Sequence, residues 1–112
     1  MIDRTGVIEI IADRFGLPVG AFTRICEREL AGRSLLPATG VMTRADLRAM
    51  SGTGDPSDME AIFAARMHHA ARDLEFMLAD LDARGVVIDQ GMAEAVAEAL
   101  APIFEVSHVR PH

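Results

Sequence analysis

The chain has no lysine, no tryptophan and no tyrosine, and it has a single cysteine. One cysteine excludes an internal disulfide framework and fits a reducing compartment. No stretch approaches the ~18 uninterrupted apolar residues that a membrane-spanning helix needs. Charged residues interrupt the apolar run of the N-terminal segment MIDRTGVIEIIADRFG, so it does not have the pattern of a signal peptide. We therefore expect a cytoplasmic protein that does not enter a membrane.

Aromatic residues are also scarce, at 4% of the 112 residues, whereas 50% of the residues are hydrophobic. Much of that half is alanine, which is the best helix former and fills little core volume. This composition favours closely packed helices over a sheet, and the length suffices for one core. The sequence predicts a single all-α domain over residues 1–112, a small bundle of four or five helices.

All eleven basic residues are arginine, and seventeen acidic residues bring the net charge to −6. This balance works against nonspecific attraction to nucleic acid or to an anionic membrane. The charge is uneven along the chain. Residues 1–33 carry five arginines and five acidic residues, whereas residues 59–112 carry four arginines and nine acidic residues. Any polyanion should therefore meet the N-terminal third.

Two helices are expected on either side of Gly16. Apolar residues at positions i, i+3, i+4 and i+7 between Ile8 and Phe15 predict the buried face of a helix that starts near residue 3 or 5. Gly16 tolerates the left-handed conformation that ends many helices, and Pro18 suits the first turn of the next helix. That second helix should end at Gly32. Its apolar stripe comprises Phe22, Ile25, Cys26 and Leu30.

Three further helices are expected after a connector at residues 32–42. Thr43 is a suitable N-cap for a short helix to about residue 50. The segment SGTGDP at residues 51–56 is the strongest break in the chain and predicts a hinge. Ser57 and Glu60 have the spacing of a capping box, in which each side chain bonds the free backbone N–H of the other. This capping box should open a long helix.

The long helix should end near residue 84, and it carries a heptad-like apolar seam. The seam consists of Phe63, Met67, Ala70, Leu74, Met77 and Leu81. Such a pattern is typical of antiparallel helix packing or of a short coiled coil. Five of these residues are therefore the candidate contacts for a protein partner or a second copy of the chain, namely Phe63, Met67, Leu74, Met77 and Leu81. The same residues can also pack against other helices of the same chain, inside one bundle.

A final helix should begin after Asp89, which can act as its N-cap. Its apolar face comprises Met92, Val96, Ala99, Leu100 and Ile103. Pro102 should bend or end this helix near the preceding turn. Residues 57–104 then form a long acidic helical hairpin, and residues 105–112 form a flexible tail.

Residues 11–30, IADRFGLPVGAFTRICEREL, contain the parts of a helix-turn-helix, in which one helix braces a second that enters the DNA major groove. They resemble one helix-turn-helix unit of the AraC type of bacterial activators. The resemblance rests on an alanine four residues before the turn glycine, the Gly16-Leu17 corner, Phe22, Arg24 and an arginine-rich end before Glu29-Leu30. It implies that residues 1–50 form a helix-turn-helix-like N-terminal part, with Thr23, Arg24 and Arg28 as its DNA contacts.

The resemblance covers one unit, whereas AraC-type domains carry two, and Pro18 replaces the usual serine N-cap of the reading helix. The alternative interpretation is an ordinary corner between two helices, in which Phe22, Ile25 and Cys26 are simply core residues. If DNA is bound, a positive patch should form from Arg14, Arg24, Arg28 and Arg33.

Catalytic and metal-binding patterns are weak. His69 and Asp73 lie one helical turn apart and could share an ion. Zinc and iron sites, however, usually have about three or four protein ligands. The spacing therefore favours a side-chain pair on the helix surface. Cys26 lies on an apolar stripe, which favours packing over nucleophilic chemistry.

We therefore expect a small non-enzymatic regulatory protein without a metal or cofactor. It would bind DNA through residues 7–30 and self-associate, as a homodimer, or bind a protein partner through the later helices. The alternative is an acidic helical adaptor or inhibitor that acts by protein–protein interaction without nucleic acid. This alternative predicts an exposed apolar patch around the seam at residues 63–81.

Overall fold

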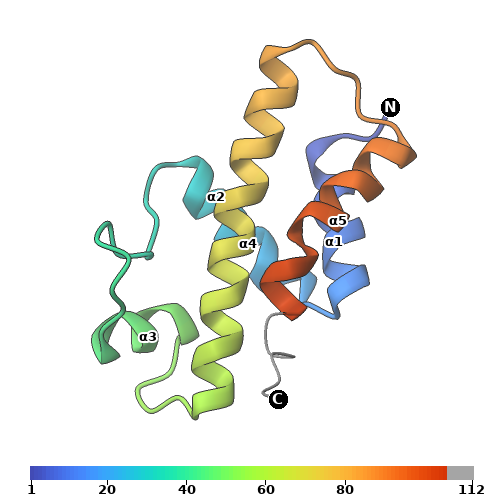
Figure 1. The fold of residues 1–112 in the computed structure, drawn as a ribbon. Coiled ribbons are helices and arrows are strands. Elements are labelled where there is room, and N and C mark those ends of the chain that lie inside the picture. The colour runs from blue at the N-terminus through green and yellow to red at the C-terminus, as the bar shows by residue number, and fades with distance from the viewer. Residues whose placement is uncertain (106–112) are drawn as a thin grey trace, which may run out of the picture.

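The computed structural model describes residues 1–105, which form five helices and no strand (Figure 1). The helices are α1 (Arg4–Phe15), α2 (Val19–Leu30), α3 (Arg44–Ser51), α4 (Asp58–Ala83) and α5 (Gln90–Glu105). The all-α prediction is confirmed for this part of the chain. None of these helices has the length and apolar character needed to cross a bilayer.

The corner between α1 and α2 follows its local signals. Gly16 adopts the left-handed conformation at φ 67°, and the backbone N–H of Leu17 donates to Ala12 O at 2.8 Å. This arrangement satisfies carbonyls at the end of α1 that have no partner within the helix. Pro18 is the N-cap of α2, one position earlier than the first-turn position that we predicted. Its extended backbone starts α2 without a side-chain cap.

Both predicted N-caps of the middle helices are confirmed. Thr43 and Asp46 form a reciprocal capping box at the start of α3, and Ser57 and Glu60 form another at the start of α4. The break between them holds Gly52, which ends α3 in a left-handed conformation at φ 76°. These contacts fix the two helix starts from residues close in sequence.

Helix α5 departs from the prediction at Pro102. Asp89 caps the helix as expected, since its Oδ1 accepts from the backbone N–H of Met92 at 2.8 Å. The helix nevertheless continues through Pro102 to Glu105, so it does not end near the preceding turn, and the bend that we gave as the other outcome stays a prediction. The Phe104 ring stacks on Phe15 with 4.6 Å between ring centroids. We attribute the continued helix to this packing beyond Pro102. The predicted flexible tail, apart from Glu105, lies outside the described residues.

Four of the helices form a closed ring. Helix α1 packs on α2, α2 on α4, α4 on α5, and α5 on α1, while α3 packs outside the ring against α4 (Figure 1). The centre of the ring holds one apolar cluster, whose largest fully buried side chains are Phe22, Ile8, Ile11, Leu74, Leu100, Val7 and Cys26. Buried alanines of α4 and α5 fill the remaining space and allow the helices to approach closely. Three elements, α2, α3 and α4, thereby meet on one side of the molecule.

Candidate anion-binding site

The arginines divide into two groups. Four of them make ion pairs, namely Arg4 with Glu75, Arg14 with Glu98, Arg72 with Asp73 and Arg84 with Asp80. Within residues 1–105, the other six make neither an ion pair nor a side-chain hydrogen bond. These are Arg24, Arg28, Arg33, Arg44, Arg48 and Arg66. All six lie in α2, in α3, in the connector between them or in the first half of α4.

Several carboxylates in the part of the chain that holds these six arginines accept hydrogen bonds from other groups. Residues 16–70 contain six arginines and six acidic residues. Asp46 accepts from the backbone N–H of Thr43 at 2.9 Å, and Glu60 accepts from that of Ser57 at 2.8 Å. Glu29 accepts from the hydroxyl of Ser34. Hydrogen bonds from the Ser57 backbone and side chain lower the pKa of Glu60 and keep it ionised within the capping box.

The opposite half is acidic. Residues 71–105 contain two arginines and eight acidic residues, and both of those arginines are in ion pairs. The charge of the protein is therefore concentrated in the second half of α4 and in α5. The half formed by α2, α3 and the start of α4, which we call the arginine half, carries the guanidinium groups that are available to an external anion.

The predicted DNA contacts Arg24 and Arg28 lie one turn apart on the exposed side of α2. The guanidinium of Arg24 extends back over Gly20, where an added Cβ would lie 3.7 Å from its Nη1. Thr23 is half-buried, and its hydroxyl donates to Val19 O at 2.7 Å. Arg14, which we expected in the same patch, is instead bound to Glu98 of α5 at 2.6 Å. DNA contact by these residues stays a prediction.

Arg24 and Arg28 line a cavity of about 300 Å³ where α2, α3 and α4 meet. The connector after α2 contributes Leu35, and the end of α3 contributes Met50 and Ser51. The full lining comprises Ala21, Arg24, Ile25, Arg28, Leu35, Ala49, Met50, Ser51, Gly52 and His68. We call this space the α2–α3–α4 cavity. It combines two guanidinium groups, several apolar side chains and one buried imidazole.

His68 is the buried polar side chain of this cavity, and only 2% of the residue is exposed. Its Nδ1 lies 2.9 Å from Ala64 O, so Nδ1 carries the proton and donates to that carbonyl. Burial lowers the pKa of His68, and Arg28 and His69 lower it further, against the raising effects of the Ala64 hydrogen bond and Glu29. The ring is therefore neutral near pH 7.

The neutral ring leaves Nε2 as a hydrogen-bond acceptor. Within residues 1–105 no hydrogen-bond partner for Nε2 is found. His68 lines the cavity, and Nε2 is the ring nitrogen that is not held against the backbone of α4. Sequence reasoning singled out His69 and missed His68, because a histidine among alanines gives no local sign of which cavity it lines.

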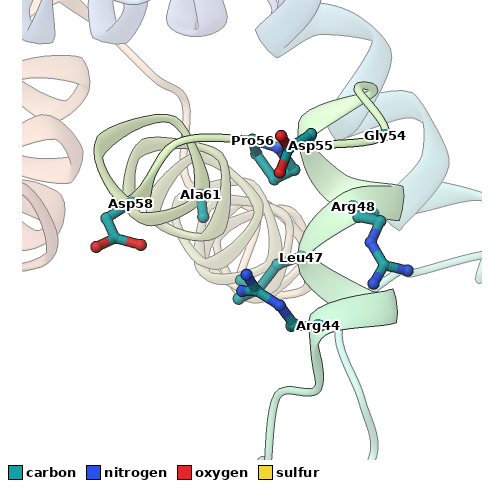
Figure 2. Close-up of a pocket in the computed structure, with 8 residues that line it drawn as sticks. All are labelled: Arg44, Leu47, Arg48, Gly54, Asp55, Pro56, Asp58 and Ala61. Atoms are coloured by element: carbon teal, nitrogen blue, oxygen red, sulfur yellow. The ribbon is translucent and has the colours of Figure 1, made fainter.

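A second, more apolar space lies between α3 and the first half of α4. Its volume is about 440 Å³, and it is lined by Met42, Leu47, Asp58, Ala61, Ile62, Ala65, Arg66 and His69. It shares Leu47, Asp58 and Ala61 with a polar pocket of about 310 Å³. In that pocket Arg44 extends toward α4 beside Leu47, whereas Arg48 points away from α4 (Figure 2). We call the two spaces together the α3–α4 groove.

The predicted partner-binding seam lies mostly inside the ring. Met67 and Leu74 are buried, Met77 and Leu81 are partly buried against the core, and Phe63 is 38% exposed. The more exposed apolar residues of α4 are Met59, Ile62 and Phe76. The apolar surface of α4 is therefore offset around the helix from the seam, because packing on α2 and α5 uses the seam itself. Partner binding by the five seam residues stays a prediction.

His69 and Asp73, which could share an ion by their spacing, both lie beside Arg72. The Nδ1 of His69 lies 3.3 Å from Arg72 Nη2, and the Nε of Arg72 lies 3.6 Å from Asp73, so Arg72 stands between the two proposed metal ligands. Within residues 1–105 no three histidine, cysteine or acidic side chains gather as metal ligands would.

Cys26 is fully buried, and burial raises the pKa of its thiol to about 12. The prediction that Cys26 packs in the core is confirmed.

No family model, curated protein or solved structure matches the chain. The interpretation of both spaces therefore depends on their own residues.

Proposed function

We propose that the protein is a small non-enzymatic regulator that binds DNA through α2 on its arginine half. The observation that carries the proposal is the set of six arginines without a carboxylate partner within residues 1–105. Lys and Arg side chains that contact phosphates supply most of the nonspecific affinity of DNA-binding proteins. Their concentration on one half allows an acidic protein to meet DNA with that half alone.

The exposed side of α2 supports contact with the groove or backbone. Arg24 and Arg28 are both exposed, and Arg33 lies in the connector that follows the helix. The likeness of residues 11–30 to an AraC-type unit favours the same helix. One bidentate arginine–guanine contact contributes about 1–3 kcal/mol of discrimination, so we expect weak binding by one protomer and tighter binding by a dimer.

A polarisation titration with DNA from upstream of the coding region, at low salt, tests the proposal. Saturable binding should weaken steeply with salt, with a log–log slope of about −0.9 for each phosphate contact. Arg24→Ala and Arg28→Ala should each weaken binding, whereas the matched control Arg84→Ala should not, because Arg84 lies on the acidic half and pairs with Asp80 at 3.2 Å. No saturable binding, or an equal loss in the control, would remove the proposal.

The second candidate is an adaptor that binds a protein through the α3–α4 groove. It is favoured by the exposure of Met59 and Ile62, at 77% and 46%, beside the largely apolar part of that groove. Self-association is the simplest form of this function. Light scattering should then show a dimer that Ile62→Glu dissociates, while Val87→Glu, in the exposed connector before α5, leaves it intact. A monomer at all concentrations would exclude self-association through this groove.

A further inference from the structure

We infer that the α2–α3–α4 cavity binds a small organic acid that also carries a hydroxyl or N–H donor. Its carboxylate would lie between Arg24 and Arg28, its donor would meet Nε2 of His68, and its apolar part would contact the cavity walls. The inference goes beyond the proposed function and does not depend on DNA binding, although both would use the same two arginines.

The two guanidinium groups select for an anion. Neither Arg24 nor Arg28 has a carboxylate partner within residues 1–105, so both retain their donors for a ligand. Guanidinium groups bind carboxylates through paired, charge-assisted hydrogen bonds. Both side chains line the same cavity, which is large enough for a metabolite-sized molecule at about 300 Å³.

His68 adds a requirement that a simple anion patch lacks. A buried polar atom without a partner is unfavourable, and a ligand that satisfies it gains affinity. Because Nδ1 donates to Ala64 O, Nε2 accepts and needs a donor from the ligand. A hydroxy acid or an N-acyl amino acid offers both a carboxylate and such a donor. Inorganic phosphate as a dianion keeps one O–H donor but has no apolar body to contact the walls.

The walls restrict the remainder of the ligand. Ile25, Leu35 and Met50 supply apolar contact, and Ala21 and Ala49 leave space beside them. The hydroxyl of Ser51 is already engaged with backbone groups of α3 and the following turn, at 3.2 Å from Arg48 O and 3.4 Å from Thr53 O. A small acid with a branched aliphatic or phenyl body therefore fits better than a polar polyol acid.

NMR titration of the full chain with mandelate and 2-hydroxy-4-methylpentanoate tests the inference. Saturable shifts should be confined to α2, the end of α3 and the His68 ring, with a change in the Nε2 nitrogen shift. Phenylacetate, which lacks the hydroxyl of mandelate, should bind up to about tenfold more weakly, because one hydrogen bond contributes about 0.5–1.5 kcal/mol. Arg24→Ala and Arg28→Ala should abolish saturation, and Arg84→Ala should not.

A direct replacement of His68 risks misfolding, because the residue is buried. Ala49→Trp avoids this problem, since Ala49 is exposed on α3 and lines the cavity. This variant should block both hydroxy acids while the fold, checked by circular dichroism, is retained. Absence of saturable binding by both acids, equal binding of phenylacetate or inorganic phosphate, or binding that survives Ala49→Trp would each overturn the inference. DNA titration of Ala49→Trp separates the two functions, because a phosphate backbone that binds outside the cavity does not need the cavity open.

Discussion

The guanidinium of Arg4 contacts both carboxylate oxygens of Glu75, a residue 71 positions later in the chain. Arg4 lies in the first turn of α1, and Glu75 lies in the second half of α4. The contact therefore joins two helices whose main packing partners are other members of the ring. The Glu75 side chain is only 11% exposed, so few water molecules can replace its partner.

Loss of this ion pair should destabilise the fold. Arg4→Ala leaves a mostly buried carboxylate unpaired, and we expect about 1–2 kcal/mol of lost unfolding free energy, less than for a fully buried pair because Arg4 is partly exposed. Arg84→Ala removes an exposed pair and should cost no more than about 0.5 kcal/mol. Urea denaturation measures both. Equal stability of the two variants would show that the Arg4–Glu75 pair contributes little.

Cys26 should be chemically inert in the folded protein. Burial, together with the negative charge of Glu75, raises the pKa of its thiol to about 12, although Arg4 acts in the opposite direction. The reactive thiolate is therefore nearly absent at neutral pH. A thiol reagent such as Ellman's reagent should label the protein only as fast as it unfolds, and urea should accelerate labelling. Rapid stoichiometric labelling of the folded chain would contradict the buried position.

Stability should decrease as the pH falls below the ordinary histidine range. Burial lowers the pKa of His68 and of His69 below the usual value of 6.5, so the unfolded chain binds protons before the folded one does. The contribution is fully present above pH 6.5 and is lost as the pH falls from there toward the folded values. Denaturation midpoints between about pH 8 and pH 5 measure the loss. His69→Gln should flatten the profile only in part, because His68 is the more buried residue and keeps its lowered pKa.

Two glycine substitutions should have opposite effects. Gly16 has φ 67°, a conformation that costs other residues about 1 kcal/mol or more, so Gly16→Ala should destabilise the fold although its Cβ would meet no atom within 4 Å. Gly20 lies within α2, and Gly20→Ala should stabilise the fold by about 0.5–1 kcal/mol through helix propensity. Thermal denaturation compares them. A stabilising Gly16→Ala would show that the corner does not need the left-handed residue.

The helix boundaries could be predicted because their signals are local. The capping pairs Thr43–Asp46 and Ser57–Glu60 need only a spacing of three residues, and the Gly16 corner needs one residue without a side chain. The continuation of α5 through Pro102 could not be predicted in this way. It coincides with ring stacking on Phe15, which is far away in the sequence.

Prediction of the candidate sites from the sequence was limited even more by tertiary packing. The periodicity of α4 marked Met67 and Leu74 as apolar, but it did not show whether they meet a partner or the ring of the same chain. Leu30 belongs to an apolar stripe by spacing and is nevertheless 64% exposed, because it lies at the last residue of α2. Arg24 and Arg28 were identified from the sequence, whereas His68 required knowledge of which elements surround the cavity.

The separation of charge between the two halves also acts at long range, before the protein touches a partner. Eight carboxylates and two arginines in residues 71–105 oppose six arginines and six acidic residues in residues 16–70, so the molecule has an electric dipole in addition to its net charge of −6. Near a strongly anionic object, the net charge repels the protein while the dipole exerts a torque that turns the arginine half forward. The protein therefore collides with such an object less often, but it arrives with the arginine half in front. Added salt screens both the repulsion and the torque.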